Sequence, residues 1–208
     1  MRSPSVIKAM RAVSRVKFLP ANMQNYAAVD TPLQIGSGQT ISAPHMVSIM
    51  NEALDLKVGN KVLEIGAGSG WHAATIAEIV APHDAPRSNW GHIYSIEIIP
   101  SLADAARKNI MNNGYGDRVT VICDDGSLGY PEKAPFERIF VAAAAPKVPK
   151  PLIDQLKIDG ILVIPVGGSY LMQHLLKYTK LSDGKIKEDN LGGVSFVPLT
   201  GELGHKIS

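Results

Sequence analysis

The stretch VLEIGAGSG, residues 62–70, runs from an apolar segment directly into three glycines, and it decides the fold of this chain. Its apolar part is typical of a buried β-strand, and the segment that follows, WHAATIAEIVA (71–81), predicts a helix. A strand that ends in glycines before a helix forms a tight turn whose backbone N–H groups can contact a ligand. The sequence therefore predicts an α/β unit with a ligand site at this turn.

The same alternation of strand and helix continues on the C-terminal side of this turn. Strands are predicted over 92–98, 118–123, 136–144 and 158–167, and helices over 100–114 and 148–156. The strands are near-continuous apolar runs, as expected for parallel strands buried on both faces. Beyond them, 171–181 and 192–201 are predicted to be antiparallel strands around the turn SDGK. We predict an α/β fold: a doubly wound, mostly parallel sheet with an antiparallel C-terminal strand pair.

The length of 208 residues suits a single domain with three parts. We expect residues 1–58 to be helices and loops that cover the site, 59–168 to form the α/β core, and 169–208 to add the C-terminal strands. Within the last part, the pair Gly192-Gly193 predicts a bend or bulge.

Composition excludes several classes of protein. No run reaches 18 apolar residues, so no membrane partner is expected, and a net charge of +2 is too small to indicate a nucleic-acid partner. The histidines show no metal-ligand spacing, so no metal is expected. The single cysteine, Cys123, cannot form an internal disulfide, which favours a reducing, cytoplasmic compartment. Cys123 is interpreted as a core residue, and a monomer is expected. The basic residues near the N-terminus are expected on the solvated face of a short amphipathic helix: Arg2, Lys8, Arg11, Arg15 and Lys17.

The spacing of the glycines separates two kinds of cofactor site. A dinucleotide site needs its third glycine at position 71, where this chain has Trp71. The observed G-x-G-x-G, with an acid two residues ahead, instead resembles the S-adenosylmethionine site of class I methyltransferases, which have a Rossmann-like fold. The resemblance places Glu64, Gly66, Gly68 and Gly70 at this cofactor. A plain glycine-rich connection is the alternative interpretation.

Carboxylates follow the next two strands. Glu97 ends the strand over 92–98, where a carboxylate can accept hydrogen bonds from both hydroxyls of a ribose. Asp124 and Asp125 follow the strand over 118–123, and one of them, with the adjacent loop backbone at Gly126, is a candidate for the adenine contact. A lone carboxylate at a strand end is alternatively a turn residue or an N-cap. Parallel strands bring all these ends to one edge of the sheet, which favours a ligand site.

Further blocks make the resemblance more specific. DTPLQIGSGQTISAPHMV (30–47), DDGSLGYPEKAPFERI (124–139) and VSFVPLTG (194–201) resemble protein-L-isoaspartate O-methyltransferases, and the likeness extends from about residue 26 to 201. It implies methyl transfer from S-adenosylmethionine to the free α-carboxylate of L-isoaspartyl residues in damaged proteins and peptides. The methyl ester then collapses to a succinimide. The family pattern also favours Asp125 over Asp124 at the adenine.

The resemblance assigns further residues to the two ligands. The expected cofactor contacts are Ile41, Ala43, Pro44, His45 and Thr200. The expected substrate contacts are Thr40, Ser42, Val194, Phe196 and Val197, the last three through strand addition by the main chain of 194–199.

Ser42 is the expected catalytic residue, through a hydrogen bond to the carboxylate that receives the methyl group. A terminal-type carboxyl has a pKa of about 3.3–3.9, so the nucleophile is ionised at neutral pH and no base is needed. The alternative is that Ser42 caps a helix over 43–54.

Other functions remain open at this stage. A methyltransferase for nucleic-acid amines is weakly supported, because VAAAAP (141–146) lacks the Asn or Asp that such enzymes place after the fourth strand. A nicotinamide dehydrogenase is disfavoured by Trp71. A relative that acts on another carboxylate, or that binds the cofactor without isoaspartyl activity, also fits. The long loop 82–91 departs from the family pattern and is a candidate for altering cofactor entry.

Overall fold

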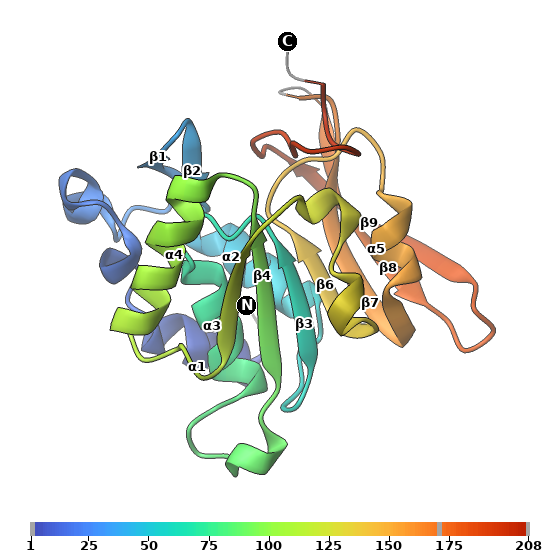
Figure 1. Cartoon of the computed structure of the whole chain (residues 1–208), viewed down its shortest axis with the longest axis horizontal. Helices are drawn as coiled ribbons and strands as arrows, with labels where there is room; N and C mark the ends of the chain where they lie inside the picture. The colour runs from blue at the N-terminus through green and yellow to red at the C-terminus, as the bar shows by residue number, and fades with distance from the viewer. Residues whose placement is uncertain (1–2, 170–171, 207–208) are drawn as a thin grey trace.

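The computed structural model describes residues 3–169 and 172–206, and its centre is a seven-stranded sheet (Figure 1). The strands are β3 (Lys61–Ile65), β4 (His92–Glu97), β5 (Val119–Cys123), β6 (Phe136–Val141), β7 (Leu156–Gly167), β8 (Gln173–Lys180) and β9 (Ile186–Val194). Their spatial order is β5-β4-β3-β6-β7-β8-β9. The strands β3 to β7 pair in parallel, whereas β8 and β9 are antiparallel. The predicted mostly parallel sheet with an antiparallel C-terminal pair is confirmed.

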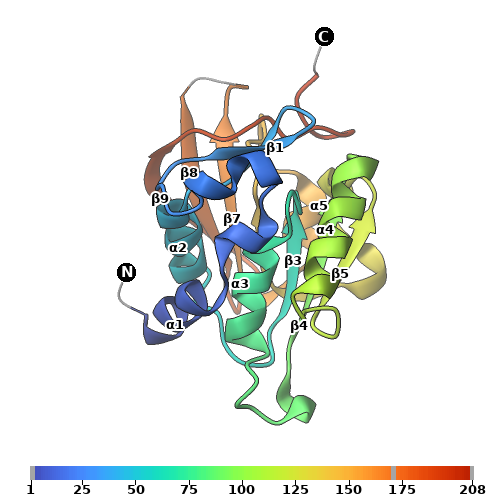
Figure 2. The same cartoon turned by 90° about the vertical axis from the view of Figure 1, so that its left-hand side faces the viewer.

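Helices cover both faces of the sheet, as the near-continuous apolar strands require (Figures 1 and 2). The α-helices are α1 (Pro4–Ala12), α2 (Pro44–Ala53), α3 (Trp71–Val80), α4 (Pro100–Asn112) and α5 (Lys150–Asp154). One apolar core joins α1 to α4 with one face of the sheet and includes Val62 of β3. A second core joins α5 with the other face and includes Leu63. Neighbouring residues of β3 thus enter different cores, because successive side chains of a strand point to opposite faces.

The N-terminal region, expected to be helices and loops, contains a strand pair. β1 (Leu33–Gly36) and β2 (Gln39–Ile41) form a two-stranded antiparallel sheet. The turn between them, Gly36-Ser37-Gly38, has positive φ at all three residues. A G-S-G between two apolar runs is a hairpin signal, and it was available in the sequence.

Arg15 overturns one expectation for the N-terminus. It lies in the 3-10 helix η1 (Arg15–Phe18) and is only 6% exposed, whereas Lys8, Arg11 and Lys17 are exposed as predicted. Its guanidinium donates hydrogen bonds to backbone carbonyls, so burial is compatible with its charge. Arg2 lies outside the described residues.

The last strand lies earlier in the chain than predicted. β9 ends at Val194, so most of the predicted strand 192–201 lies beyond it. The side-chain amide of Gln173 takes the place of a strand partner: it accepts from Phe196 N and donates to Phe196 O. Pro198 then lacks an N–H for a ladder. The predicted bulge is confirmed at Gly192, whose φ is 114° and which lies where the β8–β9 register shifts. Leu171, in the predicted strand 171–181, lies outside the described residues.

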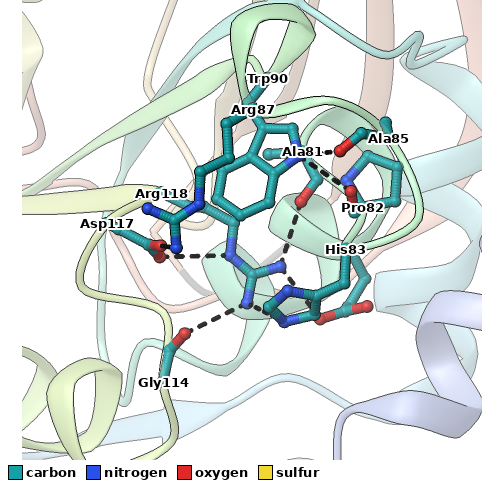
Figure 3. A network of polar contacts seen from close by, with 10 residues as sticks. Ala81, Pro82, His83, Ala85, Arg87, Trp90, Gly114, Asp117 and Arg118 are labelled. Carbon is teal, nitrogen blue, oxygen red and sulfur yellow. Dashed lines mark hydrogen bonds and ion pairs between the residues drawn. The ribbon is translucent and has the colours of Figure 1, made fainter.

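The loop 82–91 lies at the edge of the sheet opposite the carboxyl ends of the parallel strands (Figure 1). It is anchored by Arg118, which is 1% exposed and donates to Ala81 O and Gly114 O (Figure 3). Trp90 of the loop packs on the guanidinium, with 5.4 Å between ring centroid and Cζ. The suggestion that this loop alters cofactor entry is therefore wrong. Cys123, expected in the core, is instead exposed.

The two cores give a stability prediction. Leu63 is fully buried in the centre of the sheet, so Leu63→Ala should lower the free energy of unfolding by about 2–5 kcal/mol, through lost burial and the cavity left behind. Ile158→Ala is the matched control, because Ile158 is 45% exposed, and it should cost less than about 1 kcal/mol. Urea denaturation measures both. Equal costs for the two variants would contradict the packing described.

Candidate active site

A pocket opens at the carboxyl edge of the sheet, where the turn after β3 and the ends of β4 and β6 meet. Segments far apart in the sequence line it: 39–42, 64–69, 96–99, 142–143 and 197–200, with Val47, Trp71, His72 and Gly126. Ten residues expected at the ligands lie on its wall: Thr40, Ile41, Ser42, Glu64, Gly66, Gly68, Glu97, Gly126, Val197 and Thr200. The parallel register brings the ends of β3, β4 and β5 to one edge, as predicted, and the end of β6 lies at the same edge.

The glycine turn needs its glycines. Gly66, Gly68 and Gly70 have φ values of 93°, 53° and 85°, in the left-handed region that other residues avoid. Gly70 is also the N-cap of α3, and a Cβ on it would lie 3.1 Å from Ile110 Cγ1 of α4. It packs under the turn and does not line the pocket. The turn is tied to β4, because Gly66 N donates to Ile96 O at 2.8 Å.

Glu97 joins the end of β4 to this turn. Its Oε2 accepts from Gly68 N at 2.9 Å and its Oε1 accepts from Ile99 N at 3.1 Å. The side chain is 5% exposed and lines the pocket. Each carboxylate oxygen has a second lone pair, so two acceptor positions remain for a pair of neighbouring hydroxyls. The arrangement fits the ribose diol expected at this position.

Glu64 lies deeper in the same wall. It is fully buried; Ser95 Oγ donates to its Oε2, while its Oε1 is buried without a partner among the described residues. Burial raises the pKa of Glu64 to about 8, and the nearby Glu97 carboxylate adds to the rise. A positively charged ligand in the pocket would favour the ionised form of Glu64.

His72 adds a neutral imidazole to the wall, and no pattern in the sequence had pointed to this residue. The Thr75 hydroxyl donates its one proton to His72 O. Its oxygen must therefore act as acceptor toward the Asn51 amide nitrogen, at 3.1 Å. Asn51 Oδ1 must then face His72 Nε2, at 3.0 Å, and Nε2 carries the proton. Burial lowers the pKa of His72 to about 3. His72 therefore stays uncharged at neutral pH.

A second hollow adjoins the pocket. Its lining includes Thr40, Ser42, Ala43, His45 and the segment 193–197, and so contains Val194, Phe196 and Val197. Thr40, Ser42, Ala142 and Val197 border both hollows. Ser42 thus stands at the junction of the pocket expected for the cofactor and the groove expected for the substrate.

The structure excludes the capping role for Ser42. The N-cap of α2 is Ala43, and no side chain of its own caps it. The missing acceptor comes from Asp30, whose Oδ1 accepts from His45 N and approaches His45 Nδ1, both at 3.0 Å. The Ser42 hydroxyl forms no hydrogen bond with any residue that the structure describes, so it is free to donate to a ligand.

Besides Gly70, four expected cofactor contacts do not line the pocket. Ala43 and His45 face the second hollow instead, and Pro44 begins α2 outside both. Asp125 is engaged elsewhere: its Oδ1 accepts from Ser127 N and its Oδ2 from Glu202 N. Only the adjacent Gly126 reaches the pocket from this loop. Asp125 thus ties the C-terminal segment over the site.

The chain is similar to known proteins along nearly its whole length. The family model for protein-L-isoaspartate(D-aspartate) O-methyltransferase matches residues 1–204. The chain belongs to this family. It is 59% identical over 204 residues to the protein-L-isoaspartate O-methyltransferase of Hyperthermus butylicus, covering 98% of this chain and 84% of the relative. It is 52% identical over 206 residues to that of Staphylothermus marinus, covering 99% and 90%.

A solved structure shares the fold of this family member. It is the crystal structure assigned to a protein-L-isoaspartate O-methyltransferase of Plasmodium falciparum, in complex with S-adenosyl-L-homocysteine. The TM-score is 0.83 at 28% identity, and the match covers 96% of this chain and 92% of that chain. Within residues 3–169 and 172–206, no helix is long and apolar enough to span a membrane.

The contacts of Glu97 predict the effect of its removal from this methyltransferase. Glu97→Ala should weaken binding of S-adenosylmethionine by about 1.5–3 kcal/mol, the range for hydrogen bonds to a charged group. It should also lower the stability of the ligand-free chain, because Gly68 N and Ile99 N lose their acceptor. Calorimetric titration and thermal melting measure the two effects. A folded variant with native affinity would remove Glu97 from the cofactor site.

The raised pKa of Glu64 predicts that the stability of the folded chain depends on pH. Its pKa in the folded chain, about 8, lies above the ordinary 4.5, so the folded state retains a proton that the unfolded state releases. The resulting stability is fully present below about pH 4.5 and is lost as the pH rises through 8. Glu64→Gln should therefore gain stability relative to the native chain between these values, by at most about 1.4 kcal/mol per pH unit. Parallel stability curves for the two proteins would contradict the raised pKa.

Proposed function

We propose that this chain transfers a methyl group from S-adenosylmethionine to the free α-carboxylate of L-isoaspartyl residues in damaged proteins and peptides, and so starts their repair through a succinimide. The observation that carries the proposal is the position of Ser42, on the shared border of the cofactor pocket and the groove. When bound, the cofactor supplies an activated methyl group on a sulfonium.

The residues around Ser42 orient the reactants and remove no proton. A substrate carboxylate of pKa about 3.3–3.9 arrives ionised. His72, the imidazole on the pocket wall, is a poor base because its pKa is about 3. Ser42 donates a hydrogen bond to one carboxylate oxygen and leaves the other to react. Alignment of this kind supplies several kcal/mol of catalysis, and a site shielded from water suits a reaction that neutralises opposite charges.

The cofactor is held by the wall already described. Glu97 accepts from the ribose hydroxyls, the glycine turn with Gly66 and Gly68 lies against the ligand, and Thr200 closes the pocket from the C-terminal segment. Gly126 offers its backbone to the adenine. We assign Ala43 and His45 to the groove, in line with the hollow they border, and Asp125 to holding the C-terminal segment above the adenine loop.

Recognition of the substrate relies on main chain more than on side chains. Gln173 already occupies both backbone groups of Phe196, and Val197 O accepts from Ala144 N. Ser195 forms no backbone hydrogen bond with any described residue, and it lies on the groove. We therefore place the strand-addition contact at Ser195, between Val194 and Phe196. Such a contact tolerates many flanking sequences, as an enzyme of damaged proteins requires.

The proposal includes the domain organisation, the oligomeric state and the cellular compartment. The chain works as one methyltransferase domain, in which 1–58 covers the site, 59–168 holds the cofactor and 169–208 holds the substrate. It acts as a monomer in the cytoplasm, without a nucleic-acid partner. The net charge of +2 supports the absence of a nucleic-acid partner, and the single cysteine supports a reducing compartment. Light scattering of the purified chain measures the mass and tests the monomer.

The activity is tested with paired peptides that differ only in having an aspartyl or an L-isoaspartyl residue. With radiolabelled S-adenosylmethionine, the isoaspartyl peptide should acquire base-labile label and the aspartyl peptide should acquire almost none. Label on both peptides, or on neither, would contradict the proposed substrate.

Ser42 gives a second test. Ser42→Ala should lower the single-turnover rate by roughly ten- to hundredfold, the cost of one hydrogen bond to a charged oxygen. The rate of the native enzyme should be flat from about pH 6 to 8, and the variant should keep this shape, because no enzyme group must lose a proton. Ser182→Ala, at an exposed position in the distant β8–β9 turn, is the control and should leave the rate unchanged. A native profile that rises through a pKa near 6.5 would indicate a histidine base and refute this mechanism.

A further inference from the structure

Arg15 is buried beside the active site, yet no acidic side chain of the described residues forms an ion pair with it. It is 6% exposed and donates to four backbone carbonyls. Nη1 donates to Ala27 O at 3.2 Å and Val29 O at 3.0 Å. Nη2 donates to Thr31 O at 2.8 Å and Ser42 O at 3.1 Å. One planar group thus joins the segment 27–31 to the residue expected to contact the substrate.

The Nη2 contacts lie at one end of the β1–β2 pair. Leu33 of β1 pairs with Ile41 of β2, so Thr31 and Ser42 lie just beyond the last pair of the ladder. Nη2 bridges their carbonyls and continues the link between the two chains after the strands end. The direction of the Ser42 carbonyl fixes the plane of the Ser42–Ala43 peptide, and this plane helps to set where the Ser42 side chain points.

The guanidinium also contacts Trp71, a residue of the cofactor pocket. Arg15 Cζ lies 5.4 Å from the centroid of the Trp71 ring, and Trp71 lines the pocket at the start of α3. Trp71 Nε1 in turn donates to Val13 O at 3.1 Å, which ties the chain just before Arg15 to the same helix. Arg15 therefore lies between the pocket wall and the Ser42 peptide.

We propose that Arg15 is a positioning residue, which holds the Ser42 peptide and with it the Ser42 hydroxyl at the junction of pocket and groove. The role rests on the proposed function for its effect on catalysis. A guanidinium is required because its fixed planar fork directs donors to several carbonyls at once, whereas an ammonium is a single point on a flexible stem. A second tie acts on the far side of Ser42, where Asp30 of the same 27–31 segment accepts from His45 N.

The chain offers a matched control in Arg118. It is also buried, donates to the backbone carbonyls of Ala81 and Gly114, and lies 5.4 Å from the ring centroid of Trp90 (Figure 3). Its location is different, because Arg118 anchors the loop 82–91 at the edge of the sheet opposite the active site. Replacing either arginine by lysine disturbs buried hydrogen bonds to backbone carbonyls. Arg118 also forms ion pairs with Glu78 and Asp117, and only Arg15 touches the Ser42 peptide.

The test compares Arg15→Lys with Arg118→Lys in the full chain. Arg15→Lys should lower kcat for the isoaspartyl peptide by about ten- to hundredfold, the scale for a mispositioned group, with little change in KM for S-adenosylmethionine. Arg118→Lys should lower the melting temperature and leave kcat unchanged. Hydrogen exchange should rise within residues 37–47 in the first variant and not in the second. Should Arg15→Lys not fold, Arg15→Gln is the second variant: it has only two N–H donors and should also lower kcat with little change in KM for S-adenosylmethionine.

Several outcomes would overturn the inference. They are native kcat in a folded Arg15→Lys protein, an equal loss of kcat in both variants, or unchanged exchange in 37–47. A native enzyme that methylates no isoaspartyl peptide would refute the proposed function instead. In that case the exchange of 37–47 still decides whether Arg15 holds the Ser42 segment.

Discussion

The hydrogen bond from Gly68 N to the Glu97 carboxylate is the contact on which the site depends. It joins the turn after β3 to the end of β4, and the second oxygen of Glu97 holds Ile99 N ahead of α4. The turn follows this path only because Gly66, Gly68 and Gly70 adopt positive φ. One carboxylate thus shapes the floor of the pocket and keeps acceptor positions for a ligand. Structure and binding are therefore coupled at the same atoms.

The N-terminal region adds one wall of the pocket to this sheet edge. The β1–β2 pair carries Thr40 and Ile41 to the pocket, and the chain then turns at Ser42 into α2. Helix α2 does not stabilise this turn with a capping side chain, because its N-cap residue is Ala43. Arg15 and Asp30 supply the missing contacts from more distant parts of the chain. The small hydroxyl of Ser42 is thereby placed by long-range hydrogen bonds, while its own oxygen stays free.

The sequence predicted the sheet, the glycine turn and Glu97 because each follows from local pattern and from the rule that parallel strands end at one edge. The sequence patterns were insufficient where contacts between residues far apart in the chain determine the structure. Arg15 looked like a solvated cation, and only the meeting of residues 27–31 with Ser42 explains its burial. Strand β9 ends at Val194 because a glutamine side chain replaces a strand partner, which no periodicity reveals. Asp125 does not line the pocket, because its side chain turns to Ser127 N and Glu202 N, and its expected contact with the adenine stays a prediction.

The central claim is that cofactor pocket and substrate groove meet at Ser42. A crystal structure of the chain with S-adenosyl-L-homocysteine and an L-isoaspartyl peptide tests it most directly. The account predicts the ribose on Glu97, the cofactor sulfur and the peptide α-carboxylate on opposite sides of the junction, and the Ser42 hydroxyl within hydrogen-bond distance of that carboxylate. A peptide carboxylate bound away from Ser42, or a ribose held by another residue, would contradict it.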